Sequence, residues 1–211
     1  RGHPVMLSAC NNLAIILKRN GQFQEAKALL VTVYEGYCTL LGQTHAHSIV
    51  ALTNLASVYK LNLEFDQALK IYKEVLALRE KQDPLQPSEI LQVKAQIAAC
   101  QRDLNNSQES MKTFAECIEE AKRLNNDPEN LMVANLQVSK GLAAKKLKKY
   151  DLAESLYKSA LAIREAHYPF NHPEVLAICH NLASLYQELG RETEATEYSQ
   201  RVLHGLKEDQ H

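Results

Sequence analysis

A period of 42 residues constrains the fold of this chain more than any other feature of its sequence. Small residues recur at this spacing, with a single step of 43, and a second small residue follows each of them twelve positions later. The first set is Ala14, Ala56, Ala98, Gly141 and Ala183, and the second set is Ala26, Ala68, Ser110, Ala153 and Ala195. A long and nearly constant period is typical of supersecondary units that stack on their neighbours, because one unit alone cannot bury its apolar face.

Each unit has the pattern of two amphipathic helices joined by a tight turn. Apolar residues recur at i, i+3, i+4 and i+7, and the intervening residues are mostly good helix formers. The first unit predicts helices over 5–19 and 23–41, with Gly21 in the turn, where a left-handed backbone is tolerated. Pro4, Pro128 and Pro173 fall where first helices are expected to begin, because the first position of a helix needs no N–H. The small residues predict close approach of the two helices in each unit.

These columns resemble those of the tetratricopeptide repeat family, and the longer period resembles its kinesin-light-chain-like class. The matching strings include HPVMLSACNNLA, ALKIYKEVLALRE, AESLYKSALAIRE and HPEVLAICHNLASLY. The resemblance covers essentially the whole chain and is weakest in the third repeat and the first helix of the fourth. It implies an all-α fold, a right-handed superhelical solenoid of about five helix hairpins in one array over 1–211. The repeats would span approximately 1–44, 45–86, 87–129, 130–171 and 172–211.

In such arrays the first helices line a concave groove that holds an extended peptide or a partner helix. Two columns of the first helices are expected to face this groove. One column carries side-chain amides, which can both donate to and accept from a peptide backbone. The other carries Lys or Arg, which predicts an acidic segment in the peptide. The candidate peptide-binding residues are Asn11, Asn12, Lys18, Arg19, Asn54, Ser57, Lys60, Gln96, Arg102, Lys145, Lys146, His180 and Asn181.

Both columns also have an explanation that needs no ligand. The cations lie in the last turn of each first helix, where the helix dipole and the free carbonyl groups favour positive charge. The amides can brace the next hairpin instead of contacting a peptide. The sequence leaves both alternatives open.

Composition and motifs exclude several other classes of function. A net charge of −1 gives no bias towards nucleic acid or an anionic membrane surface, and no 18-residue apolar stretch is present. We therefore expect neither partner. No catalytic triad, phosphate loop or set of zinc ligands is recognisable, so we expect a non-enzyme without metal or cofactor. His45 and His172 fall in one repeat-boundary column, and the nearby His47 and His167 do not complete a ligand set.

Five cysteines without a C-x-x-C pair indicate a reducing compartment, and we expect a cytoplasmic protein. The sequence thus predicts a non-enzymatic protein–protein interaction module, an adaptor or scaffold that captures a peptide or helix. The alternative is a structural subunit of a stable complex, or an array that associates with itself through its convex or terminal surfaces.

Overall fold

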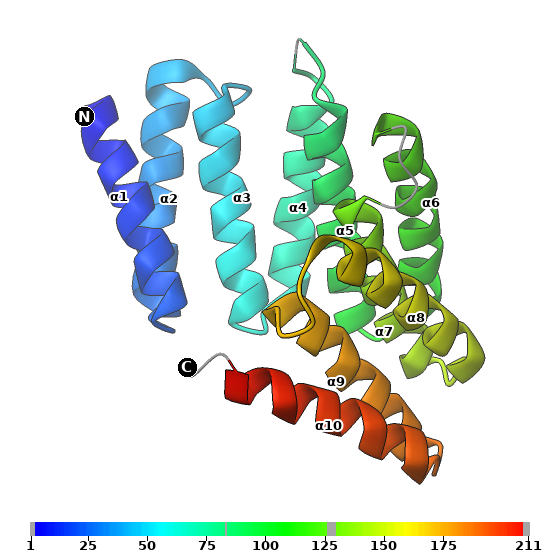
Figure 1. Ribbon diagram of the computed structural model, residues 1–211. Helices are drawn as coiled ribbons and strands as arrows, with labels where there is room; N and C mark the ends of the chain where they lie inside the picture. Colours follow the sequence, from blue (N-terminus) through cyan, green and yellow to red (C-terminus); the bar gives the residue numbers. More distant parts are fainter. Residues whose placement is uncertain (1–2, 83, 126–129, 209–211) are drawn as a thin grey trace. The chain divides into compact units, whose positions relative to one another are not determined.

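The computed structural model describes residues 3–82, 84–125 and 130–208, and all regular structure within these ranges is helical (Figure 1). The helices are α1 (Pro4–Arg19), α2 (Phe23–Leu41), α3 (Ala46–Leu61), α4 (Phe65–Arg79), α5 (Pro87–Asp103), α6 (Ser107–Asn125), α7 (Leu131–Lys146), α8 (Tyr150–His167), α9 (Pro173–Glu188) and α10 (Glu192–Glu208). The prediction of an all-α fold built from helix hairpins is confirmed, and α1 and α2 begin and end within one residue of the predicted ranges.

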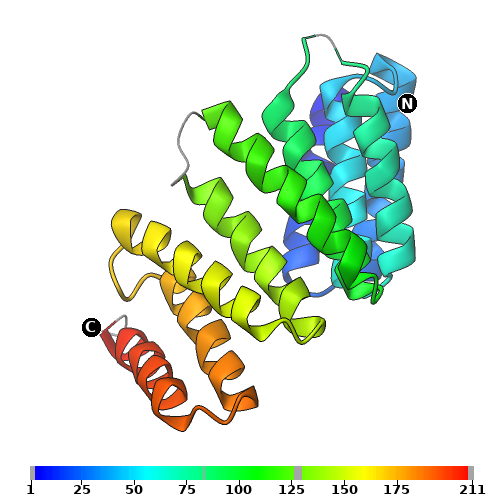
Figure 2. The ribbon, with the colours of Figure 1, turned by 90° about the vertical axis from the view of Figure 1, so that its right-hand side faces the viewer.

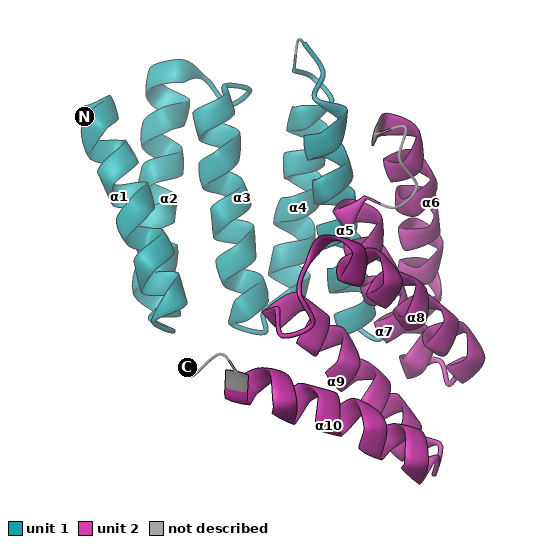
Figure 3. Ribbon diagram, viewed as in Figure 1, with its two compact units in different colours: residues 1–106 teal, residues 107–211 magenta. Residues whose placement is uncertain are grey.

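The helices group into two compact units, residues 1–106 and residues 107–211 (Figure 3). Unit 1 contains α1 to α5, and unit 2 contains α6 to α10. Within each unit, consecutive helices run side by side in opposite directions, as in the α1–α2 and α9–α10 hairpins (Figures 1 and 2). The division of the chain into one array of five repeats stays a prediction.

The first helices begin at a repeated cap. The Nδ1 atoms of His3, His45 and His172 each accept a hydrogen bond from the backbone N–H two residues later, at 3.2–3.3 Å. Such a bond satisfies an amide that has no partner inside the helix. Pro4 and Pro173 follow two of these caps as predicted, whereas Pro128 lies outside the described residues. The boundary histidines therefore begin helices.

The turn between the two helices of a repeat contains one residue with positive φ in every repeat. Gly21 and Gly190 adopt this conformation as predicted, with φ of 76° and 69°. The residues at the same column of the other repeats are Leu63, Asn105 and Lys148, with φ of 62°, 64° and 56°. The backbone of the turn is therefore common to all repeats, although three of them lack glycine there.

The two columns of small residues lie inside the helix contacts. Ala14, Ala26, Ala56 and Ala68 are fully buried in unit 1, where they pack in one cluster with Leu30 and Tyr72. In unit 2 a Cβ atom on Gly141 would come within 2.6 Å of the Tyr157 ring, so only glycine fits beside that tyrosine. The predicted role of the small residues in close helix packing is confirmed.

None of the helices in the described part of the chain has the length and apolar character needed to cross a membrane.

Candidate functional site

The basic column of the first helices reaches across to the next repeat. In unit 1 the Nζ atom of Lys18 donates to Oγ of Ser57 at 3.1 Å, and Nζ of Lys60 donates to Oε1 of Gln96 at 2.9 Å. In unit 2 Nζ of Lys145 donates to Oγ of Ser184 at 2.9 Å. In both units the structure therefore brings a predicted lysine of one first helix to a polar side chain of the next first helix, and Ser57 and Gln96 among these acceptors were also predicted.

The amide column makes a contact of the same kind. Nδ2 of Asn54 on α3 donates to Oδ1 of Asn11 on α1 at 3.0 Å. Each amide keeps further donor and acceptor capacity after this bond, because a side-chain amide can take part in up to four hydrogen bonds. The pair braces two repeats and can still bind a peptide backbone.

The cations of the basic column differ in whether a carboxylate neutralises them. Lys145 lies 3.2 Å from Glu188, and Arg102 lies 2.8 Å from Asp103. Among the described residues, no carboxylate lies within ion-pair distance of the ammonium of Lys18 or Lys60. Burial lowers the pKa of the Lys18 ammonium, with a further contribution from the charge of Arg19. Burial also lowers the pKa of Lys60.

A pocket of about 420 Å³ opens in unit 1 beside these residues. It is lined by the predicted site residues Lys18, Asn54, Ser57 and Gln96, together with Val50, Thr53, Tyr72, Arg79, Glu89, Gln92 and Val93. Most of these residues are polar, and they come from α1, α3, α4 and α5. The pocket therefore combines amide and hydroxyl groups of the second and third repeats with the ammonium group of Lys18 from the first repeat, which has no carboxylate at ion-pair distance among the described residues.

The sequence analysis missed two charged residues of this pocket, Arg79 and Glu89. They form an ion pair between the end of α4 and the start of α5. Arg164 and Glu174 form the same pair between α8 and α9 in unit 2. Both arginines are almost fully buried, at 7% and 3% exposed. A recurring signal was available, because VLALRE and ALAIRE each place Arg eleven positions after the second small residue of the repeat.

The other predicted residues lie outside this pocket. Asn12 and Arg19 are exposed on α1, and Arg102 is engaged by the neighbouring Asp103 at the end of α5. Lys145, Lys146, His180 and Asn181 lie in unit 2, on α7 and α9. Of the thirteen predicted residues, four therefore line the pocket, and Asn11 and Lys60 each bond to one of those four.

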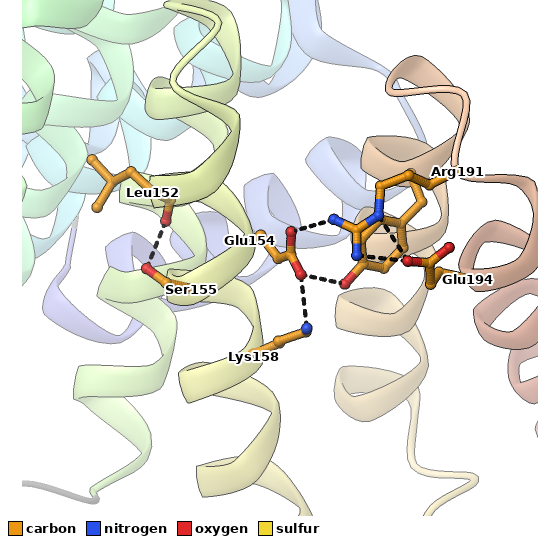
Figure 4. A network of polar contacts seen from close by, with 7 residues as sticks. Leu152, Glu154, Ser155, Lys158, Arg191 and Glu194 are labelled. Carbon is orange, nitrogen blue, oxygen red and sulfur yellow. Dashed lines mark hydrogen bonds and ion pairs between the residues drawn. The ribbon is translucent and has the colours of Figure 1, made fainter.

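A polar network braces α8 against α9 and α10 in unit 2 (Figure 4). The carboxylate of Glu154 accepts hydrogen bonds from Lys158 at 2.7 Å, from the Tyr186 hydroxyl at 2.9 Å and from Arg191 at 2.8 Å. Burial alone would raise the pKa of Glu154, but these hydrogen bonds outweigh it and hold the pKa below its usual value. In unit 1 the same two columns hold Lys27 and Glu64, which pair at 2.6 Å with the charges reversed.

The groups that line the pocket can form hydrogen bonds and ion pairs. Its described residues offer amides, hydroxyls and fixed charges, and no group of three or more His, Cys, Asp or Glu in the described ranges could hold a metal ion. Cys100 is buried, which raises the pKa of its thiol to about 11, so the reactive thiolate is disfavoured.

Comparison with known proteins agrees with the repeat pattern of the sequence and with the helical fold. Residues 5–81 and 132–208 match the family model described as a tetratricopeptide repeat. Protein KINESIN LIGHT CHAIN-RELATED 3 of Arabidopsis thaliana is 25% identical over 210 residues, which cover 98% of this chain and 32% of that protein. The chain thus spans about a third of the length of the curated relatives it matches.

Solved structures show the same fold. A putative kinesin light chain from Podosopora anserina, with nearly identical TPR-like repeats, has a TM-score of 0.75 at 24% identity. That match covers 100% of this chain and 99% of the other. A Rap protein complexed with Competence and Sporulation Factor has a TM-score of 0.79 at 18% identity, over 94% of this chain and 53% of that protein.

Proposed function

The chain belongs to the tetratricopeptide repeat family, and from this premise we propose that it is a non-enzymatic protein–protein interaction module that binds an acidic segment of an extended peptide. The binding site would be the pocket of unit 1, formed by α1, α3, α4 and α5. The fold is typical of interaction adaptors, and a Rap protein of similar fold is described in complex with Competence and Sporulation Factor. A cytoplasmic location belongs to the same proposal and is supported by five widely spaced cysteines without a C-x-x-C pair.

The observation that carries this proposal is that two ammonium groups donate to neutral acceptors and have no carboxylate at ion-pair distance among the described residues. Lys18 lines the pocket and donates to a serine hydroxyl, and Lys60 donates to Gln96, which also lines the pocket. Both acceptors are neutral. A carboxylate that replaced either acceptor would add the attraction between opposite charges to the hydrogen bond, and this attraction is stronger at a partly buried site than in bulk water. Acidic side chains of a ligand are therefore favoured here.

The neighbouring cations are less suited to this role. Lys145 and Arg102 already have carboxylates at ion-pair distance, so a ligand would have to compete with Glu188 or Asp103. We therefore assign the recognition of acidic groups to Lys18 and Lys60. The amides of Asn54 and Gln96 would contact the backbone of the peptide.

The test compares two double variants with acidic peptides as the probe. Lys18→Met with Lys60→Met removes both ammonium groups and keeps most of the buried side-chain volume. We expect the affinity for Glu- and Asp-rich peptides to fall about a hundredfold or more, because the double variant loses two bonds to charged groups and each is worth about 1.5–3 kcal/mol. Fluorescence anisotropy at low and high salt measures this loss and the weaker salt dependence that should accompany it.

The matched control is Arg102→Met with Lys145→Met, which removes two cations of the same column that already have carboxylate partners. This control should bind the peptides nearly as well as the unchanged protein. The proposal is wrong if no acidic peptide binds the unchanged protein, or if both double variants lose affinity equally.

A structural scaffold is the second candidate function. The contact of Lys18 with Ser57 and that of Lys145 with Ser184 brace adjacent repeats, and this favours a role in rigidity. In that case the Lys18→Met and Lys60→Met substitutions would lower the free energy of unfolding, and no peptide would bind the unchanged protein with measurable affinity.

A further inference from the structure

One face of the α1–α2 hairpin carries apolar side chains at columns that are buried elsewhere in the chain. Leu13 and Ile16 are 49% and 54% exposed on α1. The same two columns hold Leu55 and Val58 on α3, which are 6% and 0% exposed, and they are equally apolar on α9. The α1–α2 hairpin therefore presents a stacking surface that no described residue covers.

A pocket of about 370 Å³ lies on this hairpin, between α1 and α2. Its walls include Met6, Leu29, Thr32 and Leu40, and Gly36 forms part of its lining. A Cβ atom on Gly36 would lie 2.8 Å from the Leu7 side chain, so the glycine lets Leu7 pack closely against α2 beside the pocket. The pocket has room for an apolar side chain from an incoming helix.

Helix α10 carries an exposed apolar pair that is suited to this surface. Leu203 and Leu206 are 59% and 52% exposed. Their columns on α2 hold Tyr34 and Tyr37, and both tyrosines contact the next repeat. The Tyr34 hydroxyl donates to Glu74 at 3.4 Å, and the Tyr37 ring stacks on His47 with centroids 5.3 Å apart. The two leucines therefore occupy the positions by which a second helix packs on the following hairpin.

We propose that α10 of one copy of this chain docks on the α1–α2 hairpin of a second copy, which continues the stacking of repeats from head to tail. If the two copies pack as the first and second repeats do within one chain, three pairs of residues should meet. Leu206 meets Val5, as Tyr37 meets His47. Leu203 meets Thr32 at the pocket, as Tyr34 meets Glu74. Thr196 meets Gln22, as Lys27 meets Glu64.

The chemistry of these pairs distinguishes α10 from α4 and α8, and the exposure of Leu203 and Leu206 distinguishes it from α6, where Ile118 and Ala121 are buried at the same columns. The column of Leu206 holds Arg79 on α4 and Arg164 on α8, and each arginine needs a glutamate on the following helix. The α1–α2 hairpin offers Val5 at that position, which would leave a buried arginine without a counter-charge. Leu206 and Val5 are both apolar, and the other two pairs contain no charge. The surfaces are thus complementary in polarity as well as in position.

Head-to-tail docking joins two different surfaces of the chain, so it makes a specific prediction for mixed variants. Sedimentation velocity of the full chain over a wide concentration range should show reversible association. Val5→Glu and Leu206→Glu each change an exposed residue and should each lower the association constant about tenfold or more, because a charge is buried against an apolar partner. Mixing the two variants in equal amounts should restore association but stop it at dimers, since one intact surface of each kind remains.

Val31→Glu serves as the matched control, because Val31 is an exposed apolar residue of α2 at a column occupied by Lys73 and Lys158 in other repeats. This variant should associate like the unchanged chain. The proposal is overturned if the chain stays monomeric at every concentration, since the surface then serves another occupant. It is also overturned if the mixture remains monomeric, or if Leu206→Glu associates normally while Val5→Glu does not, which would indicate a symmetric contact between α1–α2 faces.

Discussion

At the scale of single residues, the turn column shows how one backbone conformation is imposed on different side chains. Leu63 and Lys148 adopt the left-handed conformation that Gly21 and Gly190 adopt in their own repeats. A left-handed backbone costs an L-residue with a Cβ atom roughly 1–2 kcal/mol. The hairpins on either side hold Leu63 and Lys148 in this conformation, because each turn must join two helices that already pack through their small residues.

Replacing Leu63 by glycine should therefore stabilise the protein. Leu63 is 74% exposed, so little packing is lost. We expect Leu63→Gly to raise the free energy of unfolding of unit 1 by about 1 kcal/mol, the relief of backbone strain less the greater chain entropy of glycine. Urea denaturation followed by circular dichroism measures this change.

The reverse substitution, Gly21→Leu, provides the control. No atom lies within 4 Å of a Cβ atom built on Gly21, so a loss of stability there would come from the backbone alone. We expect a decrease of similar size. If both substitutions left the denaturation midpoint unchanged, the turn would be free to leave the left-handed conformation.

At the scale of helices, an ion pair that joins a second helix to the next first helix recurs at the same two columns of the repeat. Arg79 pairs with Glu89 and Arg164 with Glu174, each pair spanning ten residues of chain. The arginine is buried and the glutamate is partly exposed, and a buried Nε atom of each arginine has no acceptor among the described residues. Each arginine therefore depends strongly on its carboxylate.

Removing the carboxylate should cost more than removing the whole pair. Glu89→Gln leaves Arg79 buried without a counter-charge, and we expect a loss of about 1–3 kcal/mol in the free energy of unfolding of unit 1. The double variant Arg79→Met with Glu89→Gln should be less destabilised than Glu89→Gln alone, because no buried charge remains. Denaturation of both variants and of Arg79→Met completes a double-mutant cycle. A double variant weaker than either single one would contradict a role based on buried charge.

At the scale of the whole molecule, the two units differ in what they offer a ligand. Unit 1 has a pocket of about 420 Å³ together with two ammonium groups that have neutral acceptors. In unit 2, Lys145 is paired with Glu188. The carboxylate of Glu154 accepts three hydrogen bonds, one each from α8, from α9 and from the turn before α10. The ammonium of Lys145 and the carboxylate of Glu154 in unit 2 are thus already paired with charged groups of the same unit.

Hydrogen–deuterium exchange of the full chain should therefore show peptide binding in unit 1 alone. With a saturating acidic peptide, we expect slower amide exchange at the parts of α1, α3 and α5 that carry Lys18, Ser57 and Gln96, since binding stabilises the folded state of these helices. The amides of α7 to α10 should exchange as in the free protein. Protection confined to α7 to α10 would place the site in unit 2 and contradict the assignment.

Much of the fold was predictable from the sequence, because the same small and apolar positions recur in five successive segments of about 42 residues. The ends of α1 and α2, the buried alanines and the glycine turns all follow from local rules of helix formation and close packing. The left-handed Leu63 and Lys148 did not follow from those rules, since their own preferences oppose the conformation and only their place in the repeat indicates it.

The candidate site was predictable only in part. The sequence placed Lys18, Lys60 and Lys145 in one column, and helix periodicity put them on one face. It did not show which of them a carboxylate neutralises, because Glu188 lies on a neighbouring helix, and no spacing along the chain expresses its distance from Lys145. The recurrence of Arg79 and Arg164 at one column could have been noticed in the sequence, but their burial and their carboxylate partners could not.

The sequence by itself determined the repeat, the helices, their turns and the columns that face one another, because each of these depends on spacing within about 42 residues of chain. Only the tertiary structure decided which charged groups are paired, which are buried without a counter-charge, and where a pocket remains. Those properties depend on distances of a few ångströms between side chains from different repeats, and such distances are set by the packing of whole helices.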